Sequence, residues 1–156
     1  MAQSVDRAFT YPPGHILCGH IRMFKNGWLI REEFTRGHPN HGHINFYDEN
    51  MDIVRTEYAS THVDHGEIHF FEGDELVRRE YASTHVDHGE IDFFEGGKLV
   101  RREFAPTHED HGEINYFQDD EYIRTEHAST HKRYGEVDFF DDGKLVRTEY
   151  KLVLTE

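Results

Sequence analysis

The stretch of residues 88–110, HGEIDFFEGGKLVRREFAPTHED, decides the fold because the chain repeats it with small changes from one end to the other. The copies begin at residues 18, 41, 65, 88, 111 and 134. The steps between them are therefore 23, 24, 23, 23 and 23 residues. A fixed period of this length is typical of repeat proteins, in which each unit packs mainly against its neighbours.

This spacing divides the chain into six tandem repeats between residues 18 and 150. The expected boundaries are 18–40, 41–64, 65–87, 88–110, 111–133 and 134–150. The one extra residue lies within residues 48–52, where the other copies have a tight turn. We expect residues 1–17 to form an N-terminal segment with a half repeat, and residues 151–156 to extend the last strand.

Each repeat has the pattern of a β-hairpin. In the third copy, residues 67–71 and 76–81 are rich in β-branched and aromatic residues and are short enough for strands. Asn26-Gly27 in the first copy is a strong signal for a two-residue hairpin turn, while Asp119-Asp120 in the fifth predicts a looser one. The sequence therefore predicts an all-β protein, an elongated antiparallel sheet of about six tandem β-hairpin repeats with a period of 23.

Pairing across the Asn26-Gly27 turn predicts which side chains share a face. If Phe24 opposes Leu29, a regular ladder places Met23 opposite Ile30. We expect one face of the sheet to be apolar and buried. In the first repeat this face carries Ile21, Met23, Ile30 and Phe34.

An Arg-x-Glu pair recurs in every repeat and is predicted to lie on the other face. Alternating Arg and Glu would form a charged ladder, which is a candidate binding surface. Its proposed contact residues are Arg55, Arg78, Arg101, Arg124, Glu57, Glu80, Glu103 and Glu126. Exposed ion pairs are common and contribute only about 0–1 kcal/mol each to stability. The alternative role of the ladder is therefore structural: it keeps one face of the sheet solvated and fixes the strand register, since a slip of one residue would bury the charges.

The repeat pattern G-x-I-x-F-F-x-x-G-x-L-V-R-x-E resembles the MORN-repeat family, in particular its variant with a Tyr-Tyr-x-Asn-Gly-x-Leu-like core. Gly89, Phe93-Phe94, Gly97 and Leu99 match that core, and the resemblance covers residues 18–150. It implies hairpins laid side by side and a role as a scaffold or docking platform for proteins. The His-x-x-His-Gly connector and the Arg-x-Glu pair depart from the family pattern.

The chain contains 14 histidines, most of them in two periodic columns of the connectors between hairpins. With neighbouring carboxylates, these imidazoles form candidate sites for Zn²⁺ or Ca²⁺. The candidate ligands are His38, His41, His62, His65, His85, His88, His108 and His111. The structural alternative is that one imidazole caps backbone groups while the other stacks on an aromatic ring or another histidine. Neither the metal-binding interpretation nor the structural alternative assigns a role to His127.

The charge and the cysteine content of the chain indicate which partners and which compartment to expect. The chain has 17 Lys and Arg against 31 Asp and Glu, a formal net charge of −14. Such a surface repels phosphate backbones and anionic lipids, so we expect neither nucleic acid nor a membrane as partner. Cys18 is the single cysteine, which excludes an internal disulfide. Without a signal-peptide pattern or a long apolar run, we expect a soluble, cytoplasmic protein.

These observations predict a non-catalytic protein-interaction or scaffold module that needs no cofactor and contacts a protein partner or a second copy of itself. The alternative is a divalent-metal-binding protein that uses the histidine connectors. Catalysis usually needs one singular pocket, whereas the reactive side chains here recur in equivalent places. The sequence also contains no nucleophile elbow, phosphate loop or zinc-protease motif, so we expect no enzyme.

Overall fold

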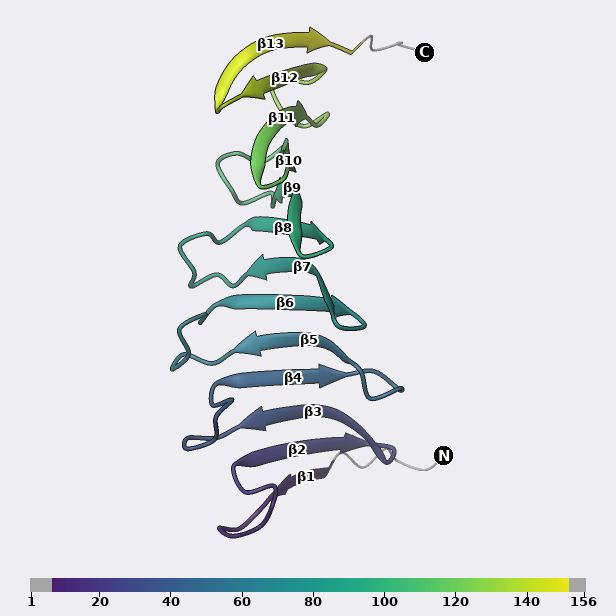
Figure 1. Ribbon diagram of the computed structural model, residues 1–156, viewed down its shortest axis with the longest axis vertical. Coiled ribbons are helices and arrows are strands. Elements are labelled where there is room, and N and C mark those ends of the chain that lie inside the picture. The colour runs from purple at the N-terminus through teal and green to yellow at the C-terminus, as the bar shows by residue number, and fades with distance from the viewer. Residues whose placement is uncertain (1–6, 152–156) are drawn as a thin grey trace. The chain divides into compact units, whose positions relative to one another are not determined.

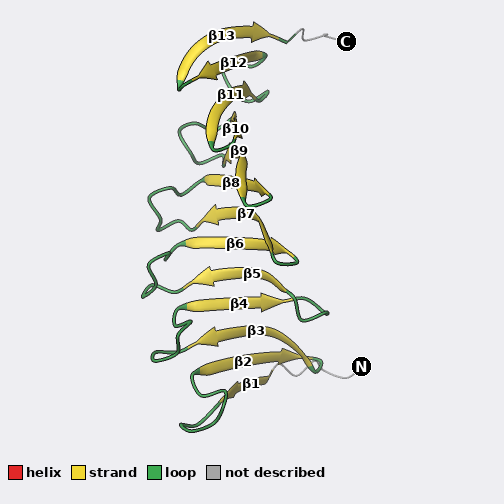
Figure 2. Ribbon diagram, in the orientation of Figure 1, coloured by secondary structure: helices red, strands yellow, loops and turns green. Residues whose placement is uncertain are grey.

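The computed structural model describes residues 7–151, which form strands, turns and loops with no helix among them (Figures 1 and 2). The chain divides into two compact units, residues 1–75 and 76–156. The predicted all-β fold of antiparallel hairpin repeats is confirmed.

The first unit pairs its strands in chain order, each antiparallel to the next. The strands are β1 (Arg7–Thr10), β2 (His20–Lys25), β3 (Trp28–Phe34), β4 (His43–Tyr47), β5 (Ile53–Tyr58) and β6 (Glu67–Glu72). The predicted half repeat at the N-terminus supplies β1, which pairs with β2. The inserted residue falls in the β4–β5 turn, where the Asp48 side chain accepts hydrogen bonds from the backbone N–H groups of Asn50 and Asp52.

The second unit continues the same antiparallel pattern in chain order. Its strands are β7 (Glu75–Tyr81), β8 (Glu90–Glu95), β9 (Lys98–Phe104), β10 (Glu113–Gln118), β11 (Glu121–His127), β12 (Glu136–Asp141) and β13 (Lys144–Tyr150). β7 begins at the last residue of the first unit. The expected strand extension at 151–156 falls on Lys151, which follows β13, and on residues outside the described range.

The turns of the hairpins are tight. Asn26 and Gly27 have φ angles of 53° and 88°, which is the left-handed conformation that a two-residue hairpin turn requires. Asp119 and Asp120 have φ angles of 53° and 65°. The expectation of a looser turn at Asp119-Asp120 is therefore wrong, because aspartate is among the few residues that accept this conformation.

A β-bulge beside the turn changes the predicted faces. Phe24 pairs with Leu29 as expected, but Met23 then pairs with Arg31 rather than with Ile30. The register shifts at the same place in the β4–β5, β8–β9, β10–β11 and β12–β13 hairpins. Because directly opposed residues share a face, Arg31 lies on the same face as Met23. The prediction that Arg and Glu occupy the face opposite Ile21 and Met23 is wrong.

In each unit, the middle of the other face is occupied by a line of polar side chains, which we call the polar row. Its members in the first unit are Arg22, Glu32, Asn45, Thr56 and His69. Its members in the second unit are Arg79, Asp92, Arg102, Asn115, Thr125, Asp138 and Thr148. Several of these, such as Glu32, Thr56 and Asp92, are buried, whereas Ile21 and Met23 are half-buried. The expected purely apolar core is thus replaced by one with a polar centre.

Candidate functional site

The face that carries the recurrent Arg and Glu residues consists of two parallel rows, which together we call the arginine–glutamate face. In one row, aromatic residues alternate with arginines from strand to strand, as in Phe93, Arg101, Tyr116 and Arg124. In the other row, aliphatic residues alternate with glutamates, as in Ile91 and Glu103. Arg55, Arg101 and Arg124 therefore each lie between two rings rather than between glutamates, and Arg78 lies beside Phe93.

The arginines stack on the rings beside them. The Cζ atom of Arg101 lies 4.1 Å from the centre of the Phe93 ring, and that of Arg124 lies 4.0 Å from the Tyr116 ring. In the first unit, Arg55 lies 3.9 Å from the Phe46 ring. A guanidinium stacked on a ring gains about 0.5–1 kcal/mol at an exposed site. The stacking also restricts the arginine to one orientation.

Each arginine also forms an ion pair with the glutamate two residues further along its own strand. The predicted pairs Arg55–Glu57, Arg78–Glu80, Arg101–Glu103 and Arg124–Glu126 have N–O distances of 2.8, 3.1, 3.1 and 3.2 Å. The arginine side chains in these pairs remain 35–40% exposed. All eight predicted contact residues therefore lie at the surface, with their charges held in place.

Hollows open on this face. One of about 320 Å³ lies beside Arg101 and is lined in part by Phe93 and Tyr116. Another of about 320 Å³ is lined in part by Ile114 and Glu126. The face is thus not flat, and its hollows are lined by both apolar and charged side chains.

On the opposite face, the polar row contains fully paired charges. Asp92 is 0% exposed and accepts hydrogen bonds from Arg102 Nε at 2.6 Å and from Arg79 Nη2 at 2.9 Å. Burial alone would raise the pKa of Asp92, but the hydrogen bonds and charges of Arg102 and Arg79 outweigh burial and lower it. Buried charges of this kind stabilise a fold only when they are paired, so this row is a structural element.

The first histidine column of the connectors caps the backbone. In each case Nδ1 accepts a hydrogen bond from the backbone N–H two residues further on, at 3.0–3.2 Å. The members of this column are His15, His38, His62, His85, His108 and His131. Their rings also lie against an aromatic ring or a histidine at the end of the preceding strand, as His108 lies 4.7 Å from Phe104. Because Nδ1 is the acceptor, the ring proton of this column sits on Nε2.

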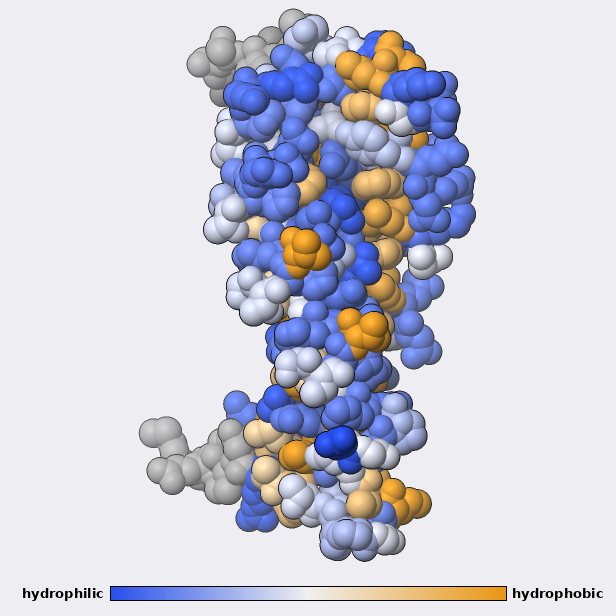
Figure 3. Space-filling model, turned by 90° about the vertical axis from the view of Figure 1, so that its left-hand side faces the viewer, coloured by the Kyte–Doolittle hydropathy of each residue, from blue (hydrophilic) through white to orange (hydrophobic). Residues whose placement is uncertain are grey.

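The second histidine column has the opposite tautomer. Nδ1 of His65, His88 and His111 lies 3.2–3.3 Å from a backbone carbonyl oxygen seven residues earlier, so Nδ1 is the donor. The structural alternative assigned capping to one column and stacking to the other. The structure instead gives both roles to the first column, while His65, His88 and His111 of the second column bond to the backbone. The surface seen in Figure 3 is mostly hydrophilic. Isolated connector residues such as Val63 and Val86 are 92% and 91% exposed.

A glycine at the end of each connector allows this packing. Gly89 has a φ of 98°, and a Cβ atom added to it would lie 3.1 Å from Cβ of His108. Its carbonyl oxygen accepts a hydrogen bond from the backbone N–H of Ala105 at 2.7 Å. The recurrence of glycine is thus explained by both a positive φ and a close approach.

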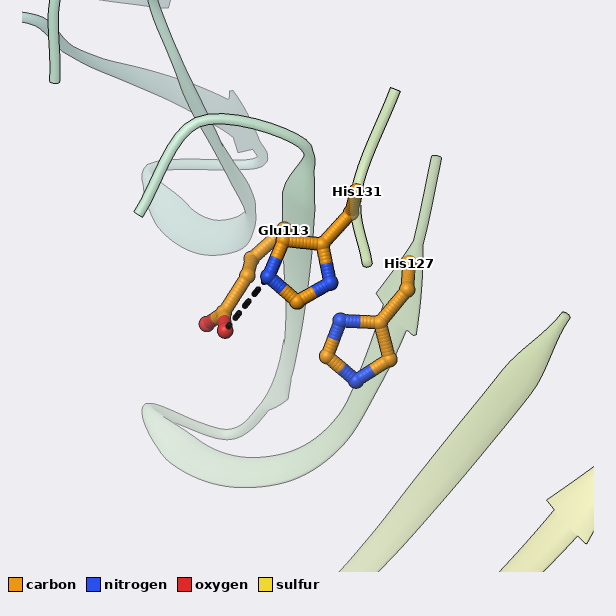
Figure 4. A group of neighbouring side chains, drawn as sticks. All are labelled: Glu113, His127 and His131. Atoms are coloured by element: carbon orange, nitrogen blue, oxygen red, sulfur yellow. Dashed lines mark ion pairs between the residues drawn. The ribbon is translucent and has the colours of Figure 1, made fainter. Parts of the chain in front are cut away.

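The fifth repeat differs from the others at one position. At the end of the second strand, the other repeats have Phe34, Tyr58, Tyr81, Phe104 and Tyr150, whereas the fifth has His127. There Glu113, His127 and His131 bring one ligand-type atom each within 4.8 Å of the others (Figure 4). None of the eight histidines predicted as metal ligands belongs to this group.

His127 is the functional candidate that the sequence reasoning missed. Its side chain is 1% exposed, and neither ring nitrogen has a hydrogen-bond partner within the described structure. Burial lowers the pKa of His127, and the positive charge of Arg133 and the neighbouring His131 lower it further. The ring is therefore neutral, the state in which histidine binds metals. The signal in the sequence is the replacement of a recurrent aromatic residue by histidine.

Comparison with protein-family models, with curated proteins and with solved structures finds no match to this chain. Within the part of the chain that the structure describes, no helix could span a membrane.

Proposed function

We propose that this chain is a non-catalytic, MORN-like interaction module that docks a protein partner on its arginine–glutamate face. The observation that carries the proposal is the regular row of half-exposed arginines, all ion-paired to glutamates and, at Arg55, Arg101 and Arg124, stacked on aromatic rings. Arginine and aromatic side chains are enriched among the residues that dominate binding energy at interfaces.

The rigidity of this face favours binding. Ordering a flexible side chain on binding costs about 0.5–1.5 kcal/mol. Arg101 is already held by the Phe93 ring and by Glu103, so it loses little freedom when a partner arrives. The hollow beside Arg101 offers space for an apolar side chain of the partner.

Charge indicates the kind of partner. The net charge of −14 attracts a basic protein and speeds its association. The glutamates beside the hollows match a segment in which lysines or arginines alternate with apolar residues. We also propose that the protein is located in the cytoplasm. The single cysteine, Cys18, is free and exposed, which fits a reducing compartment.

Selection of short random peptides displayed on phage against the immobilised protein tests this proposal. We expect enriched peptides to combine basic and apolar residues. We expect them to bind the double variant Arg101→Lys, Arg124→Lys at least about tenfold more weakly, because lysine keeps the positive charge but lacks the planar guanidinium that stacks on the rings and is frequent among hot spots. The control is the double variant Val63→Ser, Val86→Ser, which changes exposed connector residues.

Peptides that bind the arginine variant and the wild type equally well would contradict the proposal, as would the absence of enrichment. Circular dichroism confirms that each variant folds. If a second copy of the chain occupies this face instead, light scattering will report a dimer for the wild type and a monomer for the arginine variant.

A further inference from the structure

The fifth repeat contains a set of side chains that the proposed docking function does not use. Glu113 is the first residue of β10, His127 is the last residue of β11, and His131 lies in the connector that follows (Figure 4). From the group that these residues form, we propose that they bind one divalent transition-metal ion, of which Zn²⁺ is the representative. Two imidazoles and one carboxylate are a common ligand set for such ions, with a fourth position left to water.

The missing hydrogen bonds of His127 indicate a bound ligand, independently of its closeness to Glu113 and His131. A buried polar group without a hydrogen bond is costly, and most such groups in proteins have a partner. The nearest carboxylate oxygen beside His127 Nε2 is Oδ2 of Asp138, at 3.7 Å, which is too long for a hydrogen bond. Asp138 is itself paired with Arg133 at 2.8 Å. A bound ion would supply the missing partner for His127.

Comparison with a neighbouring repeat shows why, among the described residues, this three-residue group forms in the fifth repeat. The residues equivalent to Glu113, His127 and His131 in the fourth repeat are Glu90, Phe104 and His108. They include the carboxylate and the connector histidine but replace the central histidine with phenylalanine. The fifth repeat completes the three-ligand set with His127. It also has Thr125 where the fourth repeat has Arg102, which pairs with Glu90 at 2.7 Å.

Binding requires two local changes. The His127 and His131 rings are stacked at 15° with their centres 4.6 Å apart, and the Nε2 of His131 lies 3.8 Å from Glu113 Oε1. A tetrahedral ion with bonds of about 2 Å needs its ligand atoms about 3.3 Å apart, so the side chains must rotate inward.

The second change concerns the tautomer of His131. Its Nδ1 accepts the backbone N–H of Arg133 at 3.2 Å, so the ring proton sits on Nε2. When Nε2 binds the ion, the proton moves to Nδ1 and the Arg133 N–H loses its acceptor. Metal binding therefore carries a local signature: faster hydrogen exchange of the Arg133 amide.

Zn²⁺ titrated by calorimetry into the full chain, after treatment with a chelator, tests the proposal. We expect one ion per chain, and at least about 100-fold weaker binding by His127→Phe, since losing a ligand costs no less than losing an outer-shell partner. His127→Phe keeps the fold because phenylalanine occupies this position in the first and fourth repeats. His88→Gln, in a connector outside the site, should bind as the wild type does.

A gain of binding provides the sharpest test. Phe104→His places a histidine between Glu90 and His108, and we expect this variant to bind two ions per chain. Binding of several ions by the wild type, binding unaffected by His127→Phe, or no binding by the wild type would each overturn the proposal. None of these outcomes decides the docking test, because that test changes Arg101 and Arg124.

Discussion

At the scale of the residue, the most constrained side chain is Asp92. It is fully buried and faces charged and titratable groups on three strands. Those groups are Arg79 and Tyr81 on β7, Glu90 on its own strand, and Arg102 on β9. The two arginines hold the carboxyl ionised, so Asp92 stabilises the folded state whenever it carries its charge.

Asp92→Asn should therefore lower the free energy of unfolding at pH 7 by about 3 kcal/mol, because it leaves two arginine charges without their shared partner. The folded-state pKa of Asp92 lies below that of the unfolded chain. Its contribution is present above the unfolded value of about 3.9 and is lost as pH falls through the folded value. The difference between wild type and variant should thus shrink below pH ~4.

Denaturant unfolding followed by circular dichroism at several pH values measures this difference. Asparagine fits the site sterically, since Asn45 and Asn115 occupy equivalent positions. Glu95→Gln, at the exposed end of β8, serves as the control. A difference that stays constant between pH 7 and pH 3 would show that the loss comes from packing rather than from the ionised carboxylate.

At the scale of the element, the connector is the part of the repeat that tolerates the least change. Glycine, capping histidine and terminal aromatic residue contact one another, so each restricts the others. Gly89 combines a φ of 98° with a neighbour at 3.1 Å. Gly37 has a similar φ of 99° but meets nothing within 4 Å, which makes it a matched comparison.

Gly37→Ala should destabilise the fold by about 1–2 kcal/mol, the conformational cost of a left-handed residue with a Cβ atom. Gly89→Ala should cost about 1 kcal/mol more, because its methyl group also displaces His108. Thermal or denaturant unfolding of both variants measures the difference. Equal losses would mean that conformation alone explains the recurrent glycine.

At the scale of the whole molecule, we expect the net charge to determine how solubility depends on pH. The formal net charge of −14 is matched in number by 14 histidines. Acidification protonates histidines and then carboxylates, so the net charge approaches zero as the pH falls toward 5. Proteins near zero net charge associate more readily.

We therefore expect a minimum in solubility between about pH 5 and 6, in agreement with a sequence pI of about 5.4. Turbidity measured across a pH series at fixed protein concentration tests this. Added salt should change the depth of the minimum, because it screens the remaining charges. A solution that stays clear throughout this range would refute the expectation.

The sequence by itself determined the period, the hairpins and the positions of their turns, because these depend on local signals such as Asn26-Gly27 and the alternation of strand residues. It also indicated the recurrent Arg-x-Glu pairs and the connector histidines. Those features repeat, and repetition makes them visible without a structure.

Only the tertiary structure decided which residues share a face of the sheet and which candidate metal ligands lie close together. The bulge that pairs Met23 with Arg31 adds one residue to a strand, and no residue type marks it in advance. That single shift moves the residues of the second strand beyond the bulge to the opposite face, places the arginines beside aromatic rings and buries a polar row. In the same way, Glu113 and His127 lie 14 residues apart in the sequence and meet only because β10 and β11 pair antiparallel.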